Sequence, residues 1–186
     1  EVEMRDIDGH FYYLRYPLSE SASACAEYVT VATTRPETML GDTAVAVNPK
    51  DPRAAALRGK MVRLPIVNRV VPIIEDDYVV LPDADSSDEK ARYSSGFLKV
   101  TPAHDPNDYE IGQRFDLAMI NVMAPDGTIS DQHGWPAEDF AQGDAGFLLG
   151  MDRYEARKAV VDWFGQNNLL EGVKPYRHAV GHSYRS

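Results

Sequence analysis

The stretch KVTPAHDPNDYEIG, residues 99–112, changes from strand to helix within a few positions. Its first residues alternate between polar and apolar, which is typical of a strand with two unlike faces. Asp105 is a favourable N-cap and Pro106 suits the first turn of a helix, so the pattern predicts a helix that runs to about Phe115. A strand that passes through a tight loop into a helix gathers polar side chains at one point of the fold.

The rest of the chain consists mainly of short strand-like runs. They lie at residues 11–16, 27–33, 43–47, 61–64, 66–74, 77–81, 97–101 and 119–123, with an exposed loop expected at 83–95 and a hairpin turn at 125–127. Pro65 and Pro72 interrupt two apolar runs and indicate edge strands or bulges. A second helix is expected from Asp152 to about Asn168, because Asp152 and Glu155 have the spacing of a capping box.

Many short strands with few helices favour an α+β fold, with a closed or nearly closed, barrel-like sheet and short flanking helices. The chain has 186 residues, no internal repeat and no sharp shift in composition, so residues 1–186 are expected to form a single domain. Hydrophobic residues make up 44% of the chain, which is enough to bury a core without disulfides or metals. The missing initiator methionine favours a domain cut from a longer protein.

Several classes of protein and site are excluded by composition. No run approaches the ~20 apolar residues of a membrane span, so no membrane partner is expected. A single cysteine, Cys25, excludes an internal disulfide and a cysteine-based zinc site, and favours a cytoplasmic location. His178 and His182 have the spacing of a helical metal site, but Gly181 between them argues against it. Glycine-rich phosphate loops are absent, so neither a cofactor nor a metal is expected.

The charge balance limits how the chain can handle nucleic acid. It has 19 lysines and arginines against 29 aspartates and glutamates, a formal net charge of −10. A domain that gripped a phosphate backbone by itself would normally be basic. If this chain handles nucleic acid, we expect it to handle a terminus, with most of the grip supplied elsewhere. A monomer is expected.

A second polar motif, TTRPETMLGDT, occupies residues 33–43. A structural reading explains part of it, because Thr34 and Glu37 have capping-box spacing and Gly41 is placed for a C-terminal cap. That reading leaves Arg35 and Thr38 unexplained. A guanidinium and a hydroxyl on a loop at a strand end are typical of a functional site.

The first motif carries the other candidate site residues. Lys99 and Thr101 share one strand face, and Asp105 and Asp108 lie three apart on one side of the helix start. Each has a structural alternative: Asp105 is a cap, Asp108 a third-position acid, and His104 a hydrogen-bonded loop histidine. The helix dipole is expected to keep Asp108 ionised, which suits binding of an ammonium group. No serine or cysteine lies in a nucleophile elbow, which argues against a catalytic triad.

Together, ATTRPETMLGDTAVAVNP (32–49) and KVTPAHDPNDYEIG (99–112) resemble the editing domain of valyl-tRNA synthetase. That domain is the connective-peptide insertion in the catalytic domain of this class I aminoacyl-tRNA synthetase. The shorter stretches YYLRYPL, LPIVNRVVPII and HAVGHSYRS resemble the family too, so the likeness covers nearly the whole chain. The family commonly has Gly-Thr-Gly-Ala-Val before the lysine, where this chain has Ser95-Gly96-Phe97-Leu98 after Ser94.

The resemblance implies a deacylase that proofreads threonyl-tRNA(Val) by hydrolysing its ester. Its partners would be the 3′ end of the mischarged tRNA, the rest of the synthetase and, as a further substrate, threonyl adenylate. By similarity, Asp108 takes the α-ammonium group, and Thr38 and Arg35 line the pocket near the ester and the terminal adenosine. Asp108, Thr38 and Thr101 would carry the catalytic roles. Residues Arg35, Lys99, Asp105, His104 and Thr34 would bind the substrate.

Discrimination and hydrolysis place different demands on such a site. Threonine and valine are nearly the same size, so the pocket must bond the threonine hydroxyl and leave polar groups unpaired when valine enters. Lys99, Thr101 and Asp105 supply such groups, and Lys99 with Thr101 could satisfy a hydroxyl that both donates and accepts. The aminoacyl ester is already activated, so an oriented water suffices and no covalent intermediate is needed.

Two alternatives stay open from the sequence. One is an editing domain of leucyl or isoleucyl specificity, since those domains share a threonine-rich segment and a similar acid pair. The other is a non-catalytic binding module, in which both motifs are capped turns and the acidic surface meets a protein partner.

Overall fold

A computed structural model describes the backbone of residues 4–20 and 27–181 and the side chains of residues 9–20 and 27–176. Cys25 and His182 therefore lie outside the described residues. The strands are β1 (Met4–Pro17), β2 (Tyr28–Thr33), β3 (Ala44–Val47), β4 (Met61–Arg63), β5 (Val70–Glu75), β6 (Phe97–Val100) and β7 (Leu170–Gly181). The helices are α1 (Ala54–Leu57), α2 (Glu89–Tyr93), α3 (Pro106–Phe115), α4 (Glu138–Gln142) and α5 (Arg153–Gln166), with 3-10 turns η1 (Pro36–Gly41) and η2 (Ala145–Leu148).

The strands form two sheets. A three-stranded antiparallel sheet has the order β2-β1-β7, and a four-stranded sheet has the order β4-β5-β3-β6, in which only β3 and β5 run parallel. A single bridge between Leu18 and Val62 joins the sheets at one side, and β2 contacts β6 at the other. The α+β prediction is confirmed. Within the described residues, however, hydrogen bonding gives two sheets and no closed barrel.

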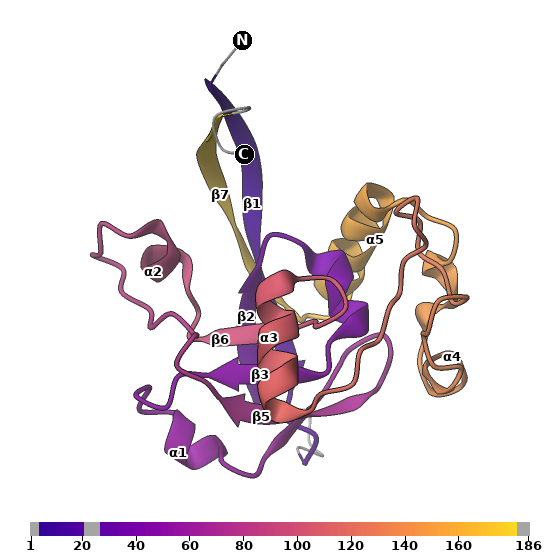
Figure 1. The fold of residues 1–186 in the computed structure, drawn as a ribbon, viewed down its shortest axis with the longest axis horizontal. Helices are drawn as coiled ribbons and strands as arrows, with labels where there is room; N and C mark the ends of the chain where they lie inside the picture. Colours follow the sequence, from indigo (N-terminus) through magenta and orange to yellow (C-terminus); the bar gives the residue numbers. More distant parts are fainter. Residues whose placement is uncertain (1–3, 21–26, 182–186) are drawn as a thin grey trace.

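Strand β3 lies at the centre of the fold and is buried on both faces. Val45 and Val47 belong to the main apolar core, which also takes in α5. Ala44 and Ala46 belong to a smaller cluster with Ile111 of α3, so this helix covers the other face. Figure 1 shows α3 crossing in front of β6, β3 and β5. A strand covered on both sides reads as a continuous apolar run, which is how AVAV appears in the sequence.

The paired strands β1 and β7 make a long ribbon. Their antiparallel pairing runs from Met4 opposite Gly181 to Leu14 opposite Leu170. Figure 1 shows this ribbon projecting from the body of the fold.

Several predicted elements differ in the structure. Residues 77–81 and 119–123 are not strands, because their backbone groups bond side chains: Asn48 donates to the Val79 carbonyl, and the Val122 amide donates to His104. The expected loop at 83–95 contains α2, capped by Asp88. Pro72 does not mark an edge strand, since β5 is internal; it lies where β5 changes its partner from β4 to β3.

No helix in the described part of the chain is both long enough and apolar enough to span a membrane. Across those same residues, no three histidine, cysteine or acidic side chains group closely enough to hold a metal ion.

Candidate active site

Hydrogen bonds between backbone groups and threonine hydroxyls hold the turn between β2 and η1 in place. The Arg35 amide donates to Thr33 Oγ1 at 3.0 Å, and the Thr38 hydroxyl donates to the Arg35 carbonyl at 2.9 Å. Thr38 is buried and its hydroxyl proton is committed to that carbonyl. The turn therefore fixes where the Thr38 oxygen lies.

The predicted capping box of Thr34 and Glu37 is wrong. The residue before η1 is Arg35, and no side chain caps that turn. Glu37 is fully buried and instead accepts two hydrogen bonds of 2.9 Å from Arg157 of α5. Gly41 ends η1 and is followed by an extended C-cap residue. A Cβ atom at position 41 would lie 2.7 Å from the Ile120 carbonyl oxygen. The acid thus anchors the turn to a helix, and the glycine permits close packing.

A buried ammonium group links the two motifs. Lys99 is only 5% exposed, and its Nζ donates to Thr38 Oγ1 at 2.7 Å and to Thr101 Oγ1 at 2.5 Å. Its third bond reaches Asp42 Oδ1 at 2.9 Å. Three donors are all that a lysine offers, so every N–H of Lys99 has a partner within the protein. The structure therefore brings Thr38, Lys99 and Thr101 together, as expected from the sequence.

Asp42 is the central residue that sequence reasoning missed. It is fully buried, and its carboxylate also accepts from the Thr101 hydroxyl at 2.5 Å and from the Tyr16 hydroxyl at 2.7 Å. Burial raises the pKa of Asp42, and Lys99 with the hydroxyl donors opposes that rise. One signal could have revealed it: a lysine among apolar strand residues needs a buried acid, and Asp42 directly follows the threonine-rich turn.

The two aspartates at the start of α3 have different roles. Asp105 caps the helix by accepting from the Asn107 and Asp108 amides at 2.8 and 3.1 Å. Asp108 is buried, and its Oδ2 accepts from the Thr101 amide at 2.9 Å. Burial raises the pKa of Asp108 to about 6, against the opposing effects of the Thr101 amide and Lys99. The helix dipole does not keep this carboxyl at an ordinary pKa, because desolvation outweighs it.

Replacing Asp105 with alanine should lower the free energy of unfolding by about 0.5–2 kcal/mol, because two amides of α3 lose their acceptor. Urea denaturation followed by circular dichroism measures the change. Asp88→Ala is a matched control, since Asp88 caps α2 through one amide only and should cost less. An unchanged urea midpoint for Asp105→Ala would refute the capping role.

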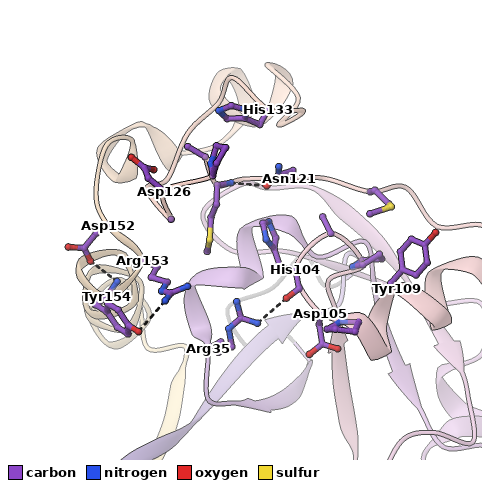
Figure 2. A pocket seen from close by; sticks show the side chains of 18 of the residues that line it. Arg35, His104, Asp105, Tyr109, Asn121, Asp126, His133, Asp152, Arg153 and Tyr154 are labelled. Carbon is purple, nitrogen blue, oxygen red and sulfur yellow. Dashed lines mark hydrogen bonds between the residues drawn. The ribbon is translucent and has the colours of Figure 1, made fainter. Parts of the chain in front are cut away.

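His104 is held as a neutral ring. Its Nε2 accepts from the Val122 amide at 3.1 Å, so the ring proton lies on Nδ1. Burial, with the nearby charges of Lys99 and Arg35, lowers the pKa of His104 to about 4. The His104 carbonyl accepts from Arg35 at 2.9 Å, a bond drawn in Figure 2. These contacts match the structural alternative for this histidine.

Seven of the eight predicted site residues line one small cavity of about 140 Å³. They are Thr34, Arg35, Thr38, Lys99, Thr101, Asp105 and Asp108. His104 lines instead a neighbouring open groove of about 1200 Å³, shown in Figure 2, which shares Arg35 and Asp105 with the small cavity. A third, mainly apolar cavity of about 240 Å³ shares Ala32, Tyr78 and Leu98 with it. The small cavity has the size for a compact polar group, with larger spaces adjoining it.

Comparison with curated proteins identifies relatives along the whole chain, although no family model matches. The chain is 46% identical over 186 residues to the valine–tRNA ligase of Halalkalibacterium halodurans and 47% identical over 188 residues to that of Prochlorococcus marinus strain NATL2A. The chain belongs to the valyl-tRNA synthetase family. Both alignments cover 100% of this chain, which spans 18% of the length of each relative.

Solved structures give the same fold at low sequence identity. A structure titled GlLeuRS-CP1 has a TM-score of 0.56 and 14% identity, covering 87% of this chain and 98% of its own. The LeuRS of an Agrobacterium radiobacter ternary complex with tRNA and LeuAMS has a TM-score of 0.55 and 17% identity, covering 95% of this chain and 20% of its own. This member of the valyl-tRNA synthetase family therefore shares the fold of the editing, CP1, domain.

Proposed function

We propose that this chain is an editing domain that hydrolyses the ester of threonyl-tRNA(Val). The observation that carries the proposal is the small cavity of about 140 Å³, whose lining includes two aspartates and four threonines. That volume lies well below the roughly 300 Å³ at which pockets for drug-sized ligands begin, which suits an amino-acid side chain with its ammonium group. Membership of a synthetase family supplies the reaction class.

Asp108 binds the α-ammonium group in this proposal. Its Oδ2 is held by the Thr101 amide, so the carboxyl has a fixed orientation and its other oxygen is left to accept from the substrate. A carboxyl with a pKa of about 6 is mostly ionised at neutral pH, so the charge needed for the contact is present. Arg35 and Thr34, from the β2–η1 turn, provide donors for the ester carbonyl.

The terminal adenine lies in the adjoining apolar cavity. Tyr78 lines both spaces and is 46% exposed, so its ring is available to a base that extends from the ester. Aromatic rings accept bases by stacking without reading their edges. The ring of Tyr93 also lines this cavity, packed against Phe11 at 4.6 Å between centroids.

Hydrolysis proceeds by direct attack of water. The water oxygen bonds the carbonyl carbon, the ester C–O bond breaks, and the terminal ribose oxygen leaves with one proton from the water. Threonine departs as a carboxylate, and the second proton passes to solvent. Fixed polar groups orient the water and the ester, and no enzyme nucleophile takes part.

The 3′ end of tRNA(Val) enters while the rest of a synthetase holds the tRNA body, which accords with a net charge of −10. Threonyl adenylate presents the same aminoacyl group and is a second substrate. We further propose a barrel-like arrangement of the two sheets, a single monomeric domain and a cytoplasmic location.

The test is deacylation of threonyl-tRNA(Val) by this chain, with valyl-tRNA(Val) as the matched control. Faster hydrolysis of the threonyl ester supports the proposal. Preferential hydrolysis of a mischarged tRNA(Leu) or tRNA(Ile) would assign the chain to the leucyl or isoleucyl alternative. Binding of the charged tRNA without any hydrolysis would favour the binding module.

A further inference from the structure

A buried carboxylate that the proposed function does not involve lies behind the small cavity. Asp42 is fully buried and does not line the cavity, yet it contacts two residues that do, Lys99 and Thr101. Its second oxygen accepts from the hydroxyl of Tyr16, which is also fully buried. This carboxylate is therefore placed to act on the substrate only through its neighbours.

The direction of each hydrogen bond around Asp42 follows from elementary chemistry. A lysine ammonium can only donate and a carboxylate can only accept. The Thr101 hydroxyl lies between Lys99 and Asp42, so it must accept from the first and donate its proton to the second. The proton of Thr101 thus points away from the cavity.

The same reasoning applies to Thr38. Its hydroxyl accepts from Lys99 at 2.7 Å and donates to the Arg35 carbonyl at 2.9 Å, and a carbonyl can only accept. Lys99 itself has no N–H left, because its three donors serve Thr38, Thr101 and Asp42. The lysine therefore orders the two hydroxyls without offering a donor of its own to the cavity.

Four residues then form what we name the acceptor wall: Thr38, Thr101, Asp105 and Asp108. Each hydroxyl keeps one lone pair beyond the one that accepts from Lys99, and each carboxylate has an oxygen beyond the one bonded to a backbone amide. Arg35, Thr33 and Thr34, from the β2–η1 turn, also line the cavity and are not counted in this wall.

We propose that Asp42 is a positioning residue that sets this polarity, so that the cavity selects a side chain able to donate a hydrogen bond. This inference rests on the proposed function and deepens it, because it states that the cavity recognises the proton of the threonine hydroxyl and not its oxygen. Recognition depends on the hydroxyl proton, and an oxygen that can only accept is rejected. Valine fails for the same reason, since it brings no proton to the wall.

Ligands with side chains of equal composition can test whether the cavity prefers a hydrogen-bond donor to an acceptor. The probes are non-hydrolysable 3′-aminoacylamido-3′-deoxyadenosines, with dissociation constants measured on this chain by NMR titration. O-methylthreonine and 3-hydroxyvaline are isomers, but only 3-hydroxyvaline keeps a donor. The 3-hydroxyvalyl compound should bind at least about tenfold more tightly, because an acceptor facing the wall leaves buried groups unpaired. The 2,3-diaminobutyryl compound, with an ammonium in place of the hydroxyl, should bind as well as the threonyl one.

Variants then assign the effect to Asp42. In Asp42→Ala the Thr101 hydroxyl loses the oxygen to which it donates, so its proton is free to turn toward the cavity and the ratio between the two isomers should fall toward one. Tyr16→Phe is the matched control: it removes a hydrogen bond to the same carboxylate but leaves Thr101 donating to it, so the ratio should persist. A wild-type ratio of about one, or a ratio that survives Asp42→Ala, would overturn the inference.

A measurement without substrate separates this inference from the proposed function. In the wild-type chain the Thr101 hydroxyl proton should give a slowly exchanging NMR signal, because it is buried and bonded to a carboxylate. That signal should persist in Tyr16→Phe and be lost in Asp42→Ala. Rapid exchange of this proton in wild type would overturn the inference whatever the hydrolysis assay shows. Failure to hydrolyse threonyl-tRNA, with the protected proton present, would overturn only the proposed function.

Discussion

Replacing Lys99 with methionine should lower the free energy of unfolding by about 3–5 kcal/mol, because the variant leaves the Asp42 carboxylate buried without its counter-charge. The Lys99 and Asp42 side chains are only 6% and 0% exposed, so solvent cannot make up the loss. Two threonine hydroxyls lose their donor at the same time. Urea denaturation followed by circular dichroism measures the effect.

Two further variants show whether that loss comes from the buried pair. The double variant Asp42→Asn/Lys99→Met should recover a large part of the stability, because neither charge remains buried alone. Lys158→Met removes a lysine from an exposed pair with Asp162, whose side chains are 80% and 55% exposed, and should change stability by less than about 1 kcal/mol. If Lys99→Met were as mild as Lys158→Met, the Lys99–Asp42 contact would contribute nothing to the fold.

Replacing Asp108 with asparagine should improve stability while it damages editing. Burial raises the folded-state pKa of Asp108 to about 6 from an ordinary 3.8, so the folded state prefers the protonated form. The ionised carboxyl therefore costs stability above pH 6, and this cost disappears below about pH 4. Asparagine removes the cost, and we expect a gain of up to about 3 kcal/mol at pH 7 that vanishes as the pH falls to 4.

The same substitution should slow deacylation of threonyl-tRNA roughly 10- to 150-fold, since a neutral amide loses the charge-assisted bond to the ammonium group. For wild type, we expect the single-turnover rate to fall as the pH drops through about 6, where Asp108 takes up a proton. The variant should show no such step. Full activity in a folded Asp108→Asn protein, or a wild-type rate that is flat between pH 5 and 7, would remove Asp108 from the ammonium site.

The sequence predicted the elements that are marked by a pattern of neighbouring residues. Helices α3 and α5 follow from their caps, Asp105 and Asp152, because a cap and its amides lie within three residues of each other. Strand β7 was missed because its partner β1 lies at the opposite end of the chain, and no local pattern encodes that pairing. Residues 119–123 look like a strand by composition, but only Met123 forms a bridge.

The candidate site divides in the same way. The polar residues of the two motifs were found because loops at strand ends collect them, and the cavity brings seven of the eight together. Their hydrogen-bond partners were not predicted, because which polar groups meet inside the protein depends on the packing of distant segments. Asp42 looked like a residue after a turn, and Tyr16 like one more aromatic residue of a strand. The pairing of Glu37 with Arg157, 120 residues away, overrode a capping box that the spacing predicted.

The ribbon of β1 and β7 has a consequence for how the chain folds as it is synthesised. β1 is made first, but its partner β7 follows only after about 150 residues, since Pro17 ends one strand and Leu170 begins the other. At ribosomal rates of about 5–20 residues per second, that interval is roughly 8–30 s. During this time β2 can cover one edge of β1 while the other edge stays open to foreign strands. The sheet closes only once β7 has emerged, so a nascent chain stalled before Leu170 should aggregate more readily than one extended past Gly181.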